Sequence, residues 1–152
     1  MQLTDTTKYA VDSLLYLAWK EERANCSQIS QATGIPRNYL QKMMITLKNV
    51  GIIKAYQGEY GGYALARPAS EITLSEIFSV FERSTVISPC LAPDYTGSEK
   101  DSPSLRKFLS GLQSVLDCYT SHTTLADLLS EKYEFDYKLV AESEAYSQAG
   151  VL

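Results

Sequence analysis

Residues 56–68 read YQGEYGGYALARP, a stretch rich in glycine and tyrosine that an arginine and a proline close. Short strand-like runs lie on both sides of its glycines, at residues 52–56 and 63–66, and this pattern is typical of a β-hairpin with a loop longer than two residues. A nucleotide-binding glycine loop would open a helix or continue into Gly-Lys-Ser/Thr, and this stretch does neither. The stretch therefore predicts the tip of a hairpin.

Two short helices are predicted directly before the hairpin. Ser27 can cap a helix that runs through Ala32, and Gly34 can adopt the left-handed turn that ends it. Pro36 suits the first position of a following helix, which Gly51 ends. The second helix has apolar residues at helical spacing, at Leu40, Met43, Met44 and Leu47. Helix, tight turn and second helix form a helix-turn-helix, and the hairpin behind it is then a wing.

Further helices flank this unit. Residues 7–20 have an apolar stripe at helical spacing, behind three N-cap candidates at residues 4–6. Thr73 and Glu76 form a capping-box sequence, in which the hydroxyl and the carboxylate each bond a free backbone N–H at the start of a helix. This box opens a helix over residues 74–82.

The longest predicted helix begins at Ser102, the N-cap, and Pro103, its first residue. Its apolar residues are spaced 3, 4, 3 and 4, at Leu105, Phe108, Leu112, Val115 and Tyr119. Leu109 and Leu116 widen this stripe into a seam of about two heptads, which predicts a dimer interface. A helix buried within its own domain is the alternative. Glycine at position 111 lowers the stability of the helix by about 1 kcal/mol relative to alanine. A close helix–helix approach would explain why glycine is tolerated there.

The predicted fold is mainly α with a small β-hairpin wing: a winged helix-turn-helix followed by a long C-terminal dimerisation helix. A short final helix is capped by Thr124 and Asp127. We divide the chain into a DNA-binding domain (1–83), a loop or sensor segment (84–102), the dimerisation helix with the final helix (103–133) and an acidic tail (134–152).

Charge is distributed unevenly along the chain. Residues 1–70 carry eight Lys/Arg against five Asp/Glu, a balance of +3, whereas residues 71–152 carry six against thirteen, a balance of −7. This asymmetry favours an N-terminal half that meets an anion. The sequence has no signal-peptide pattern and no apolar run long enough for a membrane span, so we expect a cytoplasmic protein without a membrane partner.

Polar residues at the start of the second helix are the candidates for contact with double-stranded DNA. Arg37 suits guanine O6 and N7, and Asn38 or Gln41 suits adenine N6 and N7. Tyr39 and Lys42 suit phosphates. A merely solvated helix face is the alternative.

The wing supplies a second set of candidates for DNA contact. Gly61 and Gly62 permit close approach of the backbone, and Tyr60 and Gln57 can reach the minor groove. Gln57 is neutral, so it lacks the attraction that an arginine has to a narrow minor groove.

The whole pattern resembles the Rrf2 family of bacterial transcription regulators. The matching segments are LTDTTKYAVDSLLYLA, ISQATGIPRNYLQKMMITLKNVGII, YQGEYGGYALARP, EITLSEIF and TTLADLL. The resemblance implies a homodimer in which each winged helix-turn-helix binds one half of a pseudo-palindromic operator. The family often has an arginine where this chain has Gln57.

Cysteine usage departs from the family as well. Cluster-binding members carry three closely spaced cysteines before the dimer helix, and here only Cys90 lies in that window. We therefore expect no cofactor of the usual kind, because an iron–sulfur cluster ordinarily needs four thiolate or histidine ligands. An atypical cluster that combines Cys90 with Asp94, Glu99, Asp101 or His122 stays open. Cys118 could form an intersubunit disulfide or be a buried thiol, and Cys26 is expected to be packing.

We interpret the chain as a sequence-specific DNA-binding regulator, with repression as the expected direction. The loop at residues 84–102 is the expected signal receiver, and Cys90 is its redox-sensing candidate; a small molecule or a protein is the other kind of effector. The alternative function is a protein- or metabolite-binding regulatory module that binds DNA weakly. An enzyme is not expected, because the sequence offers one histidine and no nucleophile–base pair.

Overall fold

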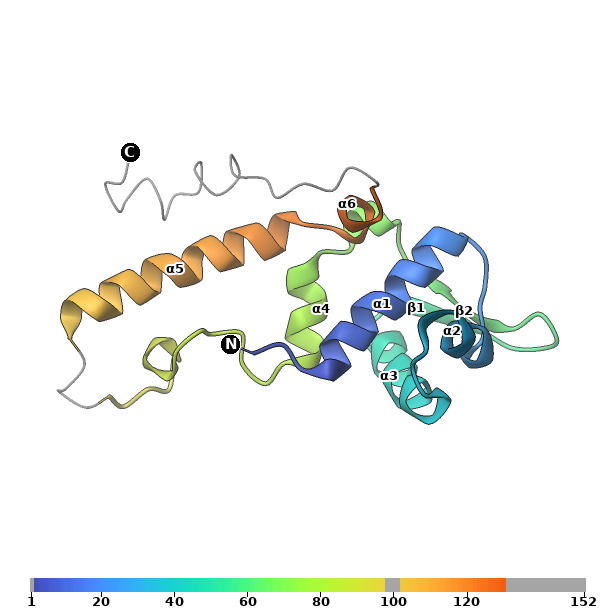
Figure 1. Cartoon of the computed structure of the whole chain (residues 1–152), viewed down its shortest axis with the longest axis horizontal. Coiled ribbons are helices and arrows are strands. Elements are labelled where there is room, and N and C mark those ends of the chain that lie inside the picture. The colour runs from blue at the N-terminus through green and yellow to red at the C-terminus, as the bar shows by residue number, and fades with distance from the viewer. Residues whose placement is uncertain (1, 98–101, 131–152) are drawn as a thin grey trace.

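The structure is a computed structural model that describes residues 2–97 and 102–130 of the 152-residue chain. The elements follow in the order α1 (Asp5–Lys20), α2 (Cys26–Thr33), α3 (Arg37–Asn49), β1 (Ile53–Tyr56), β2 (Gly62–Leu65), η1 (Ala69–Glu71), α4 (Leu74–Phe81), η2 (Pro89–Leu91), α5 (Pro103–His122) and α6 (Leu125–Leu129). The first three helices, the hairpin, α4 and α6 gather into one body, and α5 extends away from it (Figure 1). The predicted mainly α fold with a β-hairpin wing is confirmed.

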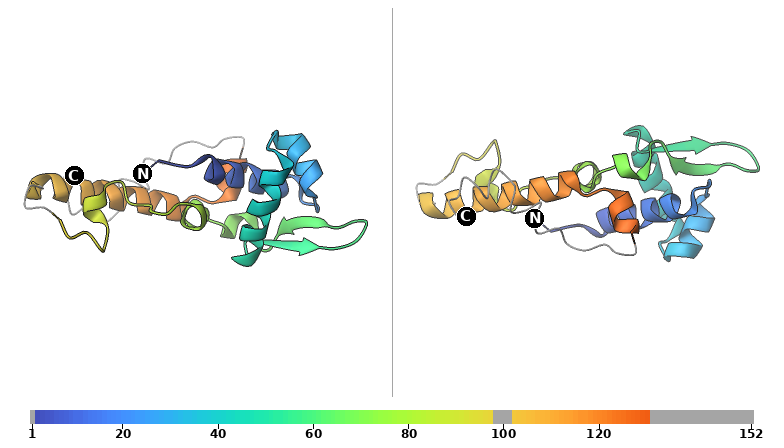
Figure 2. Two further views of the ribbon diagram at one scale, coloured as in Figure 1. Left: turned by 90° about the horizontal axis from the view of Figure 1, so that it is seen from below. Right: turned by 90° about the horizontal axis from the view of Figure 1, so that it is seen from above.

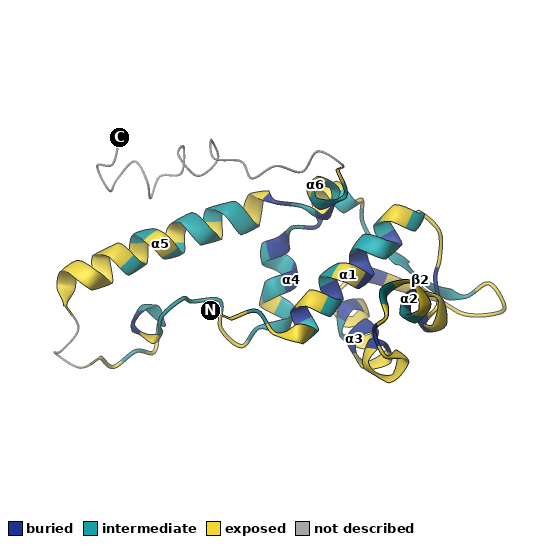
Figure 3. Ribbon diagram, in the orientation of Figure 1, coloured by how far each residue is buried: buried dark blue, intermediate teal, exposed yellow. Residues whose placement is uncertain are grey.

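The hydrophobic core lies in this body, where the apolar stripes of the helices meet. Its fully buried side chains come from helices and strands alike, among them Leu14, Ile29, Leu40, Met44, Leu47, Ile52, Ile53, Ile72, Ile77 and Leu125. Each such side chain contributes about 1.5–3 kcal/mol through burial. Buried positions are concentrated in α1 to α4, whereas exposed and half-buried ones cover α5 (Figure 3).

The helix-turn-helix is confirmed, with corrected boundaries. The N-cap of α2 is Asn25, not Ser27: the Asn25 side chain accepts from the Gln28 amide, and the Gln28 side-chain oxygen accepts from the Asn25 amide, both at 2.9 Å. This reciprocal box satisfies two amides at once, so it sets the start of the helix two residues earlier. Gly34 ends α2 at φ 75°, as predicted, and Pro36 is the N-cap of α3 rather than its first residue.

Of the two hydrogen bonds predicted for the capping box at the start of α4, the one from the Glu76 carboxylate is wrong. Thr73 accepts from the Glu76 amide at 3.3 Å, but the Glu76 carboxylate pairs with the Arg67 guanidinium instead of reaching back to the cap. Arg67 also donates to the Glu71 carbonyl at 2.9 Å, so the chain leaving the hairpin is fastened to α4. The box formed by Thr124 and Asp127 is complete, as predicted.

The hairpin is antiparallel, with Ile53 opposite Leu65 and Tyr56 opposite Gly62. A short bridge extends it, because the Ala24 amide donates to the Tyr63 carbonyl at 3.0 Å and the Tyr63 amide donates to the Ala24 carbonyl at 2.8 Å. The connection between α1 and α2 is therefore bonded to the outer edge of β2 near the loop of the hairpin, and this joins the wing to the helix-turn-helix.

The long helix α5 has no buried residue. Its C-terminal half lies against α4, and its N-terminal half extends from the body in each view (Figures 1 and 2). The first part of the predicted sensor loop is tied to α5, since the Ile87 amide donates to Gln113 at 2.8 Å and Gln113 donates to the Thr85 carbonyl at 3.2 Å. The division of the chain into four segments stays a prediction, and the acidic tail at 134–152 lies outside the described residues.

Candidate nucleic-acid interface

The polar face of α3 points into solvent at the end where a recognition helix reads bases. Arg37, Asn38, Gln41 and Lys42 are all exposed, while the opposite face is buried in the core. Pro36 supplies no side-chain cap to α3, and the Tyr39 and Leu40 amides donate to its carbonyl at 3.0 Å and 3.1 Å. The positive end of the helix dipole favours a phosphate at this terminus. The sequence-predicted residues of α3 therefore lie together on one accessible surface, and their contact with DNA stays a prediction.

Tyr39 has a structural role in addition to its predicted phosphate contact. Its hydroxyl is hydrogen-bonded to the Thr6 hydroxyl, and its ring stands edge-on to Tyr9 with centroids 5.5 Å apart. Tyr39 thus fastens the first turn of α3 to the first turns of α1. Sequence reasoning missed Thr6, because it considered this residue only as an N-cap.

A carboxylate at the end of α4 holds the start of α1. The Glu82 side chain accepts from the Thr4 amide at 2.8 Å, from the Thr4 hydroxyl at 3.1 Å and from the Thr7 hydroxyl. The Thr7 hydroxyl and the Thr4 amide lower the pKa of Glu82, because both bonds favour the ionised carboxylate. Glu82 precedes the predicted sensor loop by two residues, so the loop begins where α1 is anchored. No sequence signal connects residues so far apart, and Glu82 was missed.

The wing presents its two predicted side chains to solvent, with Gln57 exposed and Tyr60 83% exposed. Its two glycines, Gly61 and Gly62, are needed by the fold because a side chain at either position would collide with the backbone. A Cβ at Gly61 would lie 2.5 Å from the Tyr56 carbonyl oxygen, and one at Gly62, which has φ 143°, would lie 2.7 Å from the Ala24 carbonyl group. Both glycines are thus required by the hairpin, and the predicted approach of their backbone to DNA remains to be tested.

Arg23 adds a cation beside the loop end of the wing. Its guanidinium carbon lies 3.5 Å from the centre of the Tyr56 ring, on an exposed turn between α1 and α2. A cation stacked on an aromatic ring is held in a defined direction. Arg23 was not among the predicted DNA contacts, because it lies outside both the recognition helix and the wing in sequence.

The cysteines lie in three separate parts of the structure. Cys26 is buried beside Tyr63, and burial raises the pKa of its thiol, which agrees with the packing role expected of it. Cys90 is also buried, in η2, with its sulfur 3.3 Å from the Ser88 hydroxyl. Cys118 is half-buried on α5, 3.9 Å from the His122 ring. Within residues 2–97 and 102–130, no three His, Cys, Asp or Glu side chains are grouped to hold a metal ion.

The predicted seam of α5 is open along its N-terminal half. Leu105, Phe108 and Leu112 are 55%, 64% and 41% exposed, whereas Val115 and Tyr119 are half-buried. A Cβ at Gly111 would meet nothing within 4 Å, so the helix–helix approach expected there is not made by any of the described residues. None of the described helices is long and apolar enough to cross a lipid bilayer.

Comparison with known proteins agrees with this arrangement. The family model "Rrf2: Iron-dependent Transcriptional regulator" matches residues 3–131. The chain is 32% identical to Protein aau3 of Rhizobium meliloti, covering 97% of each chain. It is also 32% identical to the HTH-type transcriptional regulator NsrR of Geobacillus kaustophilus, over 87% of this chain and 92% of the relative.

A solved structure shares the fold. The structure of CymR, the global cysteine regulator of B. subtilis, aligns with a TM-score of 0.73 and 24% identity over 85% of this chain and 96% of that one. The family match and the two relatives show that this chain belongs to the Rrf2 family, and together with the shared fold they identify it as a DNA-binding transcriptional regulator.

Proposed function

We propose that the protein is a repressor that binds a pseudo-palindromic operator as a homodimer. The observation that carries the proposal is the exposed polar start of α3 next to an exposed wing that the same core holds in place. In this geometry α3 enters the major groove and Tyr60 and Gln57 follow the adjacent minor groove. Arg23 adds a phosphate contact beside the loop end of the wing.

The homodimer is supported by the apolar surface of α5. Three large side chains in its N-terminal half are at least 41% exposed, in a row at coiled-coil spacing. Contiguous exposed apolar residues of this kind mark protein–protein contacts. A twofold-related pair of recognition helices then requires two half-sites about one helical turn apart.

The experiment is selection of bound duplexes from a random pool, followed by affinity measurement over a range of salt concentrations. We expect an inverted repeat, an affinity that falls steeply with salt, and loss of transcription from a promoter that overlaps the site. Weak binding without sequence preference would instead favour the protein- or metabolite-binding module. Increased transcription would leave the DNA-binding role intact and reverse the direction of control.

Iron chemistry of the usual family kind does not fit the residues of this chain. Its three cysteines are residues 26, 90 and 118. The first is in the core of the DNA-binding body and the last is on α5, so Cys90 is the only thiol in the loop. One thiolate does not meet the ligand requirement of a [2Fe–2S] cluster. The proposal therefore assigns no step to a cluster.

The loop that starts after Glu82 is the element we propose as signal receiver. It is bonded to α5 through Gln113 and begins at the carboxylate that anchors α1. Any effector that reorders it acts on both the dimer helix and the body that carries α3. The effector is a small molecule or a protein, or an oxidant that reaches Cys90.

The contribution of Cys90 is tested by the substitution Cys90→Ser. If Cys90 is the redox group, oxidant changes operator affinity in the parent protein and leaves the variant unaffected, as measured by fluorescence anisotropy. Cys118→Ser is the matched comparison, because it removes the half-buried thiol of α5, for which an intersubunit disulfide stays open. Equal responses of parent, Cys90→Ser and Cys118→Ser would leave a small molecule or a protein as the signal.

A further inference from the structure

A pocket lies where the recognition helix α3 meets the start of α1 and the end of α4. Its volume is about 260 Å³, just below the usual range of small-molecule sites, so it suits a compact ligand. Three helices contribute its lining, which consists of Thr6, Tyr39, Lys42, Met43, Thr46 and Phe81. We call it the α3 pocket.

The lining of the α3 pocket has an apolar part and a polar part. Met43 is buried, Phe81 is half-buried, and the rings of Phe81 and Tyr39 add flat apolar surface. The polar part is three hydroxyl groups and the ammonium group of Lys42. Sites for small molecules usually combine an apolar lining with a small number of polar groups that orient the ligand.

The polar groups of the α3 pocket favour an anion. No described acidic side chain pairs with Lys42. The hydroxyls of Thr6 and Tyr39 are hydrogen-bonded to each other. That bond uses one of their two hydrogens, so the other can be donated to an acceptor in the pocket. An ammonium group and a hydroxyl hydrogen together suit a carboxylate.

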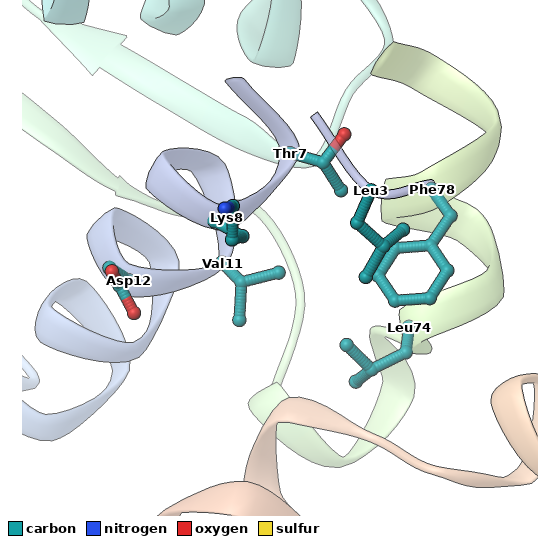
Figure 4. Close-up of a pocket in the computed structure, with 7 residues that line it drawn as sticks. All are labelled: Leu3, Thr7, Lys8, Val11, Asp12, Leu74 and Phe78. Carbon is teal, nitrogen blue, oxygen red and sulfur yellow. The ribbon is translucent and has the colours of Figure 1, made fainter. Parts of the chain in front are cut away.

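A second pocket, between α1 and α4, lacks these features (Figure 4). Its cation, Lys8, is already paired with Asp5 at 2.7 Å, and its hydroxyl, on Thr7, already donates to Glu82. Asp12 adds a carboxylate to its lining, which repels an anion. Of these two pockets, the α3 pocket is therefore the better site for an anionic ligand.

The α3 pocket also joins three parts of the protein that the proposed function uses. Lys42 is the predicted phosphate contact of the recognition helix. Tyr39 fastens the first turn of α3 to α1. Phe81 directly precedes Glu82, which anchors α1 where the proposed signal-receiving loop begins. A ligand in this pocket touches the recognition helix, its support on α1 and the end of α4 at the same time.

We propose that the α3 pocket binds a compact aromatic molecule with one carboxylate, and that this ligand releases the protein from its operator. The carboxylate pairs with Lys42 and accepts the remaining hydroxyl hydrogen, and the ring packs against Met43 and Phe81. The bound carboxylate neutralises the charge that Lys42 offers to a DNA phosphate, so each ligand lowers the affinity for the other. The inference rests on the proposed function and adds a site and a chemical class for its small-molecule effector.

Binding is measured first on the full-length protein without DNA. Benzoate is the probe, and benzamide and benzamidine are a neutral and a cationic molecule of similar shape. Carbon-13 labelling of methionine methyl groups reports on the site, because Met43 lines the pocket whereas Met44 is fully buried in the core and does not line it. We expect benzoate to shift the Met43 signal and not the Met44 signal, with an affinity about fivefold higher than that of benzamide. Benzamidine should shift neither signal.

Three results of this titration would overturn the proposal. Benzoate that leaves the Met43 signal unchanged would show that the pocket binds no such ligand. Equal affinities for benzoate and benzamide would show that the carboxylate is not recognised. Inorganic phosphate that reproduces the benzoate shift would show a simple anion site, as expected of a seat for the DNA backbone.

The charge of Lys42 is tested by Lys42→Met, which keeps the apolar stem of the side chain and removes the ammonium group. It should weaken benzoate binding about fivefold. Lys48→Met is the matched control, because Lys48 is exposed on the same helix and lies outside the pocket. Equal affinities of the two variants would contradict the pairing with Lys42. An unchanged Met44 signal shows that each variant is folded.

The effect on DNA is tested with Thr46→Leu, which fills the pocket and leaves the predicted DNA contacts in place. In the parent protein, sodium benzoate should lower operator affinity at least about fivefold relative to sodium chloride at the same concentration. Thr46→Leu should bind the operator as the parent does and respond to both salts alike, as fluorescence anisotropy would measure.

Two outcomes separate the ligand site from the proposed function. If the protein binds no operator, the proposed function fails, and the Met43 titration alone decides whether the site exists. If benzoate shifts Met43 but lowers operator affinity no more than sodium chloride does, the operator role stands and the proposed release by the ligand is wrong.

Discussion

At the scale of single residues, Glu82 is the clearest electrostatic element of the structure. Because bonds from Thr7 and Thr4 hold its pKa below the ordinary value of 4.5, its contribution to stability is complete above that value and disappears as the pH falls through the lowered pKa. We predict that Glu82→Gln lowers the melting temperature at pH 7 and that its difference from the parent protein vanishes in acid. Thermal unfolding across pH measures this.

The matched control for Glu82 is Glu22→Gln, an exposed carboxylate on the turn after α1. It should change the melting temperature little at any pH. The difference in melting temperature between Glu82→Gln and the parent protein could instead stay constant down to the most acidic pH at which the protein folds. That result would show that the carboxylate charge plays no part in anchoring α1.

Substitution of Gly62 should destabilise the protein, because both its backbone angle and its surroundings require glycine. An alanine there would combine φ 143° with a Cβ 2.7 Å from the Ala24 backbone. We predict that Gly62→Ala lowers the free energy of unfolding by about 1–3 kcal/mol, as urea titration would measure. Gly34→Ala is the control: it has φ 75° but open space around its Cβ, so it should cost less. Equal losses would mean that the backbone angle alone, and not the contact with Ala24, requires glycine.

At the scale of elements, α3 carries the prediction about recognition. Arg37→Ala should cost about 1–3 kcal/mol on the best operator and relax the preference at one base pair. Lys42→Ala should weaken binding to all sequences alike and reduce the salt dependence, because a phosphate contact carries no sequence information. Anisotropy titrations with matched and mismatched duplexes measure both. Unchanged binding by both variants would mean that another element reads the DNA.

The sequence predicts the helices and strands better than it predicts the contacts between them. The helices and the wing follow from local signals, namely apolar spacing, Gly34 and the glycines of the hairpin. The start of α2 was misplaced because Asn25 and Gln28 form a stronger cap than Ser27 alone. The carboxylate of Glu76 was misassigned because Arg67, nine residues earlier, competes for it. The contacts of Glu82 and Thr6 depend on tertiary packing, so no local pattern could have indicated them.

At the scale of the whole molecule, dimerisation depends on α5. We predict that Leu112→Asp abolishes dimers, since it places a charge at the centre of the proposed helix pair. Lys107→Asp, on the opposite side of α5, is the control and should remain a dimer. Sedimentation velocity at micromolar concentration distinguishes the two. A dimeric Leu112→Asp protein would place the interface elsewhere.

The two hydrogen bonds between Ala24 and Tyr63 have a consequence for the kinetics of DNA association. They fix the loop end of β2 before any DNA is present, so the conformational entropy of that segment is lost on folding and not on binding. The amides of Ala24 and Tyr63 should therefore exchange slowly with solvent deuterium in the free protein, and the association rate should be insensitive to changes that stiffen this end of β2.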